Sequence, residues 1–150
     1  IEADVINKYI THFGNEEVLN KENIIVFPHV GGSTEEAELN CAIAAGQTIR
    51  RFMETGEIIN SVNFPNMKQF LDAPYRITLI NKNVPNIVAS ITTAVSELEI
   101  NIDNIINRSK GNYAYTLLDL DESDETKIAK LVEKFKATDA ITKVRVIKHK

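Results

Sequence analysis

Cysteine and basic runs are scarce in this sequence, and each scarcity excludes a class of protein. Cys41 is the only cysteine among 150 residues, so no internal disulfide can form. No charged start precedes an apolar run with a small-residue cleavage site, so we expect a reducing, cytoplasmic compartment. No apolar stretch approaches the roughly 18 residues of a membrane span. With 17 Lys and Arg against 21 Asp and Glu, the net charge is −4 and no basic tract is present, which argues against nucleic acid and membranes as partners.

The remaining composition is that of a folded chain, with 43% hydrophobic and 25% charged residues. The sequence starts at Ile1 without an initiator methionine, inside a segment that already has the pattern of folded structure, so we expect a piece of a longer protein. Residues 1–70 carry five basic and ten acidic groups, whereas residues 71–150 are nearly balanced. Because prolines interrupt the pattern near the middle, we predict a first domain at 1–65, a linker at 66–74 and a second domain at 75–150.

The first domain reads as strand, glycine turn and helix. The apolar run Ile24–Phe27, stopped by Pro28, predicts a buried strand, and Lys8–Thr11 is a candidate for a second one. After Gly31 and Gly32, the spacing of Ser33 and Glu36 is that of a capping box at the start of a helix. We expect this helix to run through Met53, to end at Gly56 and to pack one apolar face, made of Ala37, Cys41, Ala45, Ile49 and Phe52.

The second domain has a clearer periodicity. Alternating residues from Tyr75 predict a strand, and Pro85 suits the first position of a helix with an apolar face at Ile87, Val88, Ile91, Val95 and Leu98. A hairpin follows, with its turn at 109–112, and then a helix with acidic residues at its start and lysines at its end. A last strand contains Val144 and Val146. The order strand, helix, strand, strand, helix, strand predicts a ferredoxin-like fold.

Two motifs bring a family into view. The segment Phe27–Ala37 closely resembles the "PHxGGST" segment of the D-2-hydroxyacid dehydrogenases in the version found in phosphoglycerate dehydrogenases, and Ser61–Pro65 resembles the "VNFP" end of the same region. Residues 75–150 resemble the ACT regulatory domain. The resemblance implies an α/β fold, with the C-terminal piece of a dehydrogenase catalytic body followed by a ferredoxin-like βαββαβ ACT domain. It also implies NAD-dependent oxidation of 3-phosphoglycerate to 3-phosphohydroxypyruvate, in L-serine biosynthesis.

The resemblance assigns roles in the first domain. His29 matches the histidine that acts as general acid/base, a task that suits an imidazole. Glu16 aligns best with the glutamate that orients this histidine, and Glu17 is the alternative, although adjacent glutamates are also common on solvated surfaces. Gly31 and Gly32 would let the nicotinamide approach closely, or would serve the turn alone. The six glycines nowhere form G-x-G-x-x-G, so we expect this piece to be inactive alone.

In the second domain, the resemblance assigns an effector site to three asparagines. Asn81, Asn83 and Asn101 match positions that hold an amino acid, L-serine in serine-regulated relatives, across a dimer interface of ACT domains. Asn81 stands where those relatives usually have histidine, and Asn86 where the common pattern has glycine. The alternative is that these asparagines only form loops. No ligand set for a metal is expected, and we assign no role to His12 or His149.

Two other functions remain open at this stage. The chain could act only as an amino-acid-binding, dimerising ACT module, or its parent could oxidise another 2-hydroxy acid.

Overall fold

The computed structural model describes residues 7–149 and divides the chain into two compact units, the first ending at Ala45 and the second beginning at Gly46. We describe each unit by itself.

The first unit contains a small parallel sheet. Strand β1 (Tyr9–Thr11) pairs with β2 (Ile24–Val26), so that Tyr9 lies opposite Ile24. Both predicted strands are therefore confirmed. The expectation that the strand at Ile24–Phe27 is buried is wrong, because Ile25 and Phe27 are exposed. Two strands of three residues offer no second layer against which either face of the sheet can pack.

Helix α1 (Glu35–Thr55) forms where it was predicted and continues two residues beyond Met53, but its N-cap is one residue away from the predicted one. The Oγ1 of Thr34 accepts a hydrogen bond from the Ala37 N–H at 3.1 Å, so Thr34 caps the helix and Ser33 does not. The predicted C-terminal glycine is confirmed, since Gly56 has a φ of +71° and its N–H donates to the Phe52 carbonyl at 2.9 Å.

The apolar face predicted for α1 is not packed, which corrects the expectation for Cys41. No residue of α1 is buried, and the Cys41 thiol is exposed. Phe52, near the end of the helix, lies under the Arg145 guanidinium and is still 39% exposed.

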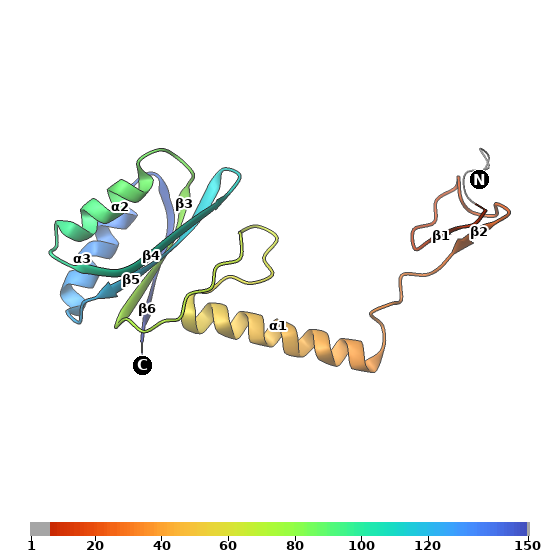
Figure 1. The fold of residues 1–150 in the computed structure, drawn as a ribbon, viewed down its shortest axis with the longest axis horizontal. Helices are drawn as coiled ribbons and strands as arrows, with labels where there is room; N and C mark the ends of the chain where they lie inside the picture. Colours follow the sequence, from red (N-terminus) through yellow and green to blue (C-terminus); the bar gives the residue numbers. More distant parts are fainter. Residues whose placement is uncertain (1–6, 150) are drawn as a thin grey trace. The chain divides into compact units, whose positions relative to one another are not determined.

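The second unit is built around a four-stranded antiparallel sheet (Figure 1). The strands lie in the order β4 (Asn101–Lys110), β5 (Tyr113–Asp121), β3 (Tyr75–Lys82) and β6 (Ile141–Lys148). Helices α2 (Ile87–Ser96) and α3 (Glu125–Lys136) both cover one face of it. The predicted βαββαβ order is confirmed.

The main core lies between the sheet and these two helices. It contains Ile77 and Leu79 from β3, Ile91 from α2, Leu118 from β5 and Leu131 from α3, all fully buried. The predicted start of α2 is wrong, because Pro85 lies outside the helix. Asn86 has a φ of +64°, a left-handed conformation that a right-handed helix cannot contain, so the helix begins after it.

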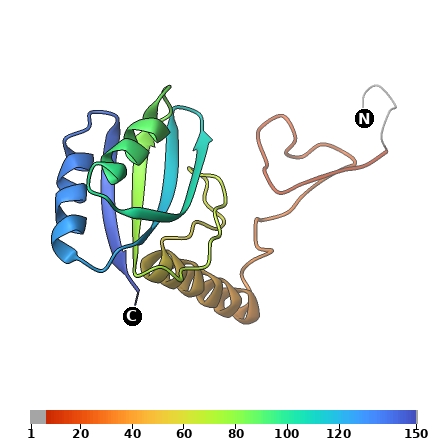
Figure 2. The ribbon, with the colours of Figure 1, turned by 60° about the vertical axis from the view of Figure 1, so that its left-hand side comes forward.

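The other face of the sheet is covered by the chain that follows α1 (Figures 1 and 2). Ile58 and Met67 form a β-bridge and are buried against Tyr115 and Leu117 of β5. Residues 66–74, expected to act as a linker, are therefore packed at several positions: Met67, Leu71 and Ala73 are buried.

Candidate functional site

His29 lies at one edge of the small sheet, next to a second histidine. The Nδ1 atoms of His12 and His29 are 3.2 Å apart, and the ring of Phe13 stacks on His29 at 5.4 Å between centroids. Because β1 and β2 are parallel neighbours, their carboxyl ends meet at the same edge, and the two histidines follow those ends. The structure thus places His29 where α/β proteins commonly hold reactive groups.

The contact with His12 orients His29. A hydrogen bond between two ring nitrogens needs one protonated and one unprotonated nitrogen, so the pair shares one proton at Nδ1. Within residues 7–149, the Nε2 atom of His29 has no hydrogen-bond partner. Nε2 is therefore the nitrogen available to exchange a proton with another molecule.

Neither of the two predicted glutamates contacts His29 through its carboxylate in the described part of the chain. Glu16 and Glu17 are exposed and follow Asn15, whose Oδ1 accepts hydrogen bonds from the N–H groups of Glu17 and Val18, both at 3.1 Å. In the described part of the chain, no hydrogen bond or ion pair joins either carboxylate to His29. Sequence reasoning missed His12, although its position directly after a candidate strand was a signal that could have found it.

Gly31 and Gly32 are glycines that nothing in their surroundings requires. Neither has a left-handed φ, and a Cβ atom added to either would meet no heavy atom within 4 Å. A larger residue would thus fit at both positions in the described structure. The bare backbone beside His29 leaves room for the close approach of another group.

The predicted effector residue Asn81 lies at the end of β3, fully buried within a chain of hydrogen bonds. Its Oδ1 accepts from the Thr116 hydroxyl at 3.0 Å, and its Nδ2 donates to the Lys82 carbonyl at 3.0 Å. Thr116 in turn accepts from the Nδ2 of Asn107 at 2.7 Å. We call Asn81, Thr116 and Asn107 the asparagine network. Sequence reasoning missed two of its members, Thr116 and Asn107.

The other two predicted effector residues lie at opposite ends of the sheet. Asn83 is exposed and joins the β4–β5 turn, where its Nδ2 donates to the Gly111 carbonyl at 3.2 Å. Asn101, the first residue of β4, pairs with Asp121 at the far end of β5. One chain therefore brings Asn81 and Asn83 to the same end of the sheet and leaves Asn101 at the other.

A fully buried arginine holds the end of α1 on the sheet. The guanidinium of Arg76 pairs with the carboxylate of Asp119, with 2.7 Å between Nη2 and Oδ2. It also donates to the carbonyls of Thr55 at 2.8 Å, Gln69 at 2.9 Å and Phe70 at 3.0 Å. All five N–H groups of the guanidinium are thereby used. Sequence reasoning missed this pair, although opposite charges within two largely apolar strands, basic in β3 and acidic in β5, were a signal.

Two more side chains of the sheet bind the same helix end. Arg145 donates to the carbonyls of Phe52, at 2.9 Å, and Met53, and its guanidinium lies 5.1 Å from the Phe52 ring centroid. The Tyr115 hydroxyl donates to the Gly56 carbonyl at 2.8 Å, and burial raises the pKa of this phenol. Side chains thus satisfy carbonyls that the end of a helix leaves without partners.

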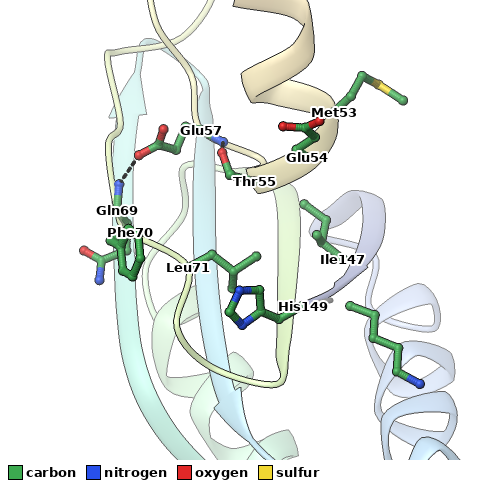
Figure 3. A pocket seen from close by; sticks show the side chains of 10 residues that line it. Met53, Glu54, Thr55, Glu57, Gln69, Phe70, Leu71, Ile147 and His149 are labelled. Atoms are coloured by element: carbon green, nitrogen blue, oxygen red, sulfur yellow. Dashed lines mark hydrogen bonds between the residues drawn. The ribbon is translucent and has the colours of Figure 1, made fainter.

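A pocket of about 580 Å³ opens beside this junction (Figure 3). Its wall includes Glu57, whose carboxylate accepts from the Gln69 N–H at 2.7 Å, together with Leu71 and His149. None of the predicted catalytic or effector residues lines it. Among the residues that the structure describes, no group of three or more His, Cys, Asp or Glu could hold a metal ion. Within that same range, no helix has the length and apolar character needed to cross a membrane.

Comparison with known proteins agrees with the fold. Residues 72–145 match the ACT domain family. D-3-phosphoglycerate dehydrogenase 2 of Saccharomyces cerevisiae is 30% identical over 136 residues, which cover 87% of this chain and 29% of that protein. D-3-phosphoglycerate dehydrogenase of Escherichia coli is 25% identical over 126 residues, which cover 84% of this chain and 30% of that protein. The chain thus spans under a third of the curated relatives it matches, and it is homologous to their C-terminal part.

Two solved structures are similar to about half of this chain. The ACT domain from GTP pyrophosphokinase of Chlorobium tepidum superposes with a TM-score of 0.45 at 18% identity, covering 49% of this chain and 95% of that one. An ACT domain protein from Streptococcus pneumoniae gives a TM-score of 0.42 at 25% identity, covering 49% and 86%.

Proposed function

We propose that this chain is the C-terminal part of an NAD-dependent D-3-phosphoglycerate dehydrogenase, which oxidises 3-phosphoglycerate to 3-phosphohydroxypyruvate. The observation that carries the proposal is homology to such dehydrogenases over 87% of the chain. Because that homology starts before the ACT domain, it includes the segment of His29 and extends beyond a shared regulatory fold.

In this proposal, His29 acts as the general acid/base. Its free Nε2 takes the proton of the substrate hydroxyl while the hydrogen on the same carbon leaves as hydride, so that the alcohol becomes a ketone. NAD supplies the acceptor for that hydride. The open backbone at Gly31 and Gly32 fits a nicotinamide ring that approaches His29 closely. The rest of the dinucleotide site has to come from the parent protein, since G-x-G-x-x-G is absent here.

Burial supports the view that the first unit belongs to a larger catalytic body. No described residue from 7 to 55 is buried, and large apolar side chains are exposed along it, among them Phe13, Val30 and Ile43. A segment with so little internal core gains its stability from packing against other structure. We therefore expect this chain alone to be inactive.

The reaction is tested with the full-length parent protein. NADH formation should be fastest, judged by kcat/KM, with 3-phosphoglycerate and much slower with D-lactate or another 2-hydroxy acid that lacks the phosphate. A clear preference for a different 2-hydroxy acid would replace the proposed substrate and keep the dehydrogenase. Loss of turnover in only one of Glu16→Gln and Glu17→Gln would identify a carboxylate that orients His29 in the full-length protein, whereas unchanged turnover in both would leave that task to His12.

A second function, effector binding by a pair of ACT domains, is favoured by the position of the three asparagines. Strand β4 is an edge of the sheet, with unpaired backbone groups along one side. If β4 pairs antiparallel with the β4 of a second copy, Asn101 comes close to Asn81 and Asn83 of the partner subunit. The three positions that one chain separates then meet, and we propose that they hold an amino acid such as L-serine there.

Two measurements on this chain test the second function. Light scattering should show a dimer, and calorimetry should show L-serine binding that Asn101→Ala abolishes. Asn104→Ala is a matched control, because Asn104 lies on the same strand away from its end. A monomer that binds no amino acid would refute the proposed regulatory function. It would not affect the proposal that the parent protein is a dehydrogenase.

A further inference from the structure

Strand β5 makes buried hydrogen bonds on both of its faces at adjacent residues. On the helix side, the Thr116 hydroxyl binds Asn81 and Asn107. On the opposite side, the Tyr115 hydroxyl binds the carbonyl of Gly56, the residue directly after α1. Thr116 is 0% exposed and Tyr115 is 2% exposed, so water cannot replace the hydrogen-bond partners of either hydroxyl. The position of β5 is therefore fixed from both faces within one peptide unit.

The neighbouring strand β3 has the same double role. Arg76, near its start, lies opposite Asp119 of β5 and donates to the Thr55 carbonyl of α1. Asn81, near its end, binds Thr116 of β5. One pair of hydrogen-bonded strands thus carries both the asparagine network and the contacts that hold the end of α1. A shift of one strand along the other must change both.

We propose that β5 couples the asparagine network to the last turn of α1. A ligand that competes for the hydrogen bonds of Asn81 or Thr116 displaces β5 and loosens the grip of Tyr115 and Arg76 on the helix end. This proposal rests on the proposed effector site, because Asn81 belongs to it. Thr116 and Tyr115 are positioning residues in this account.

The consequence reaches the segment of His29 along the chain. Helix α1 is continuous from Glu35 to Thr55, and it begins three residues after Gly32. Its last turn is the part held by the sheet. Loosening or tightening that turn therefore changes how the sheet restrains the helix that leads to the proposed catalytic residue.

Hydrogen exchange on this chain tests the coupling without any ligand. Thr116→Val keeps the shape of the side chain and removes both of its hydrogen bonds. The Gly56 amide, which donates to the Phe52 carbonyl, should then exchange about five to ten times faster, the loss expected for about one hydrogen bond. Thr116→Ser, which retains the hydroxyl, should exchange as the unmodified chain does. If Thr116→Val does not fold, Asn107→Ala removes only the outer hydrogen bond and should have a smaller effect of the same kind.

Ile128→Val is the matched control, because Ile128 is buried in the main core and belongs to neither network. It should leave exchange at Gly56 unchanged. The coupling would be refuted if Ile128→Val accelerated the Gly56 amide as much as Thr116→Val did, or if Thr116→Val left it unaltered.

Coupling is reciprocal, which supplies a second readout. Tyr115→Phe removes the bond to Gly56 and should accelerate exchange of the Asn83 amide, which donates to the Asn112 carbonyl in the β4–β5 turn, at the end of the sheet where the asparagine network lies. An unchanged Asn83 amide would contradict the proposal. L-serine binding is measured separately, so failure of the effector site and failure of the coupling can be told apart.

Discussion

At the scale of single residues, Gly56 has the least room for a side chain among the six glycines. Its φ of +71° disfavours any side chain, and an added Cβ atom would lie 2.6 Å from the Thr78 Cγ2 atom. We expect Gly56→Ala to lower the free energy of unfolding by about 1–3 kcal/mol, measured by urea denaturation. Gly46→Ala is the control: Gly46 lies inside α1 in open space, so the same change should leave stability equal or raise it by up to about 1 kcal/mol. Equal losses in both variants would show that the backbone at Gly56 is not constrained.

Tyr115 makes the free energy of unfolding depend on pH in the alkaline range. Burial is the main cause that raises its pKa above the ordinary 10.0, against smaller opposing effects of a Thr78 hydrogen bond and the Arg145 and Arg76 charges. The unfolded phenol therefore ionises first as pH rises. The stability from the neutral phenol is complete below pH 10.0 and is lost as pH rises through the folded pKa.

Urea unfolding between about pH 8 and about pH 11 measures this effect. Tyr115→Phe should cost about 1 kcal/mol at neutral pH and should lose less stability above pH 10 than the unmodified chain. Tyr113→Phe, at an exposed phenol, should keep the unmodified slope. A Tyr115→Phe profile parallel to that of the unmodified chain would contradict the assignment.

At the scale of elements, the two helices that cover the four-stranded sheet begin in different ways. Asp124 caps α3, where its side chain accepts from the Thr126 N–H at 2.7 Å, whereas Asn86 makes no such bond at the start of α2. Asp124→Ala should therefore destabilise the chain by about 1 kcal/mol in thermal unfolding. Asp139→Ala, at an exposed aspartate outside the helix, should have no measurable effect. A similar loss in both would mean that net charge matters and the cap does not.

The elements themselves were predictable, because their signals are local. Alternation from Tyr75 and helical spacing from Ile87 each lie within one element, and the order of elements then selects the sheet. Contacts between distant elements left weaker signals. The Arg76–Asp119 pair and the asparagine network depend on which strands are neighbours, and their members are too far apart in sequence to form a motif. His12 was missed for the same reason, since its role follows from the pairing of β1 with β2.

Predictions about burial failed where the prediction assumed a layer that the described units do not contain. The apolar pattern of Ile24–Phe27 and of α1 was correct, and both segments fold as expected, yet Cys41 and Ile25 are exposed. A hydrophobic pattern predicts that one face of an element packs against other structure. It does not identify the structure against which that face packs.

At the scale of the whole molecule, stability should come from the second unit. A chain that starts at Gly46 retains the buried residues on both faces of the sheet, and it should unfold at the same urea concentration as the complete chain. A chain that starts at Tyr75 loses Ile58 and Met67 from the second face and leaves Arg76 without its carbonyl partners, so its midpoint should fall clearly. A lower midpoint for the Gly46 chain would show that the first unit contributes a core of its own.

The central claim is that His29 accepts the proton of the substrate hydroxyl, and one comparison of turnover tests it most directly. In the full-length protein, His29→Gln should lower kcat for NADH formation from 3-phosphoglycerate by roughly 100-fold or more, because a glutamine cannot accept the hydroxyl proton. His149→Gln, which changes a histidine outside the proposed site, should keep the unmodified rate. Equal turnover in His29→Gln and the unmodified enzyme would contradict the account.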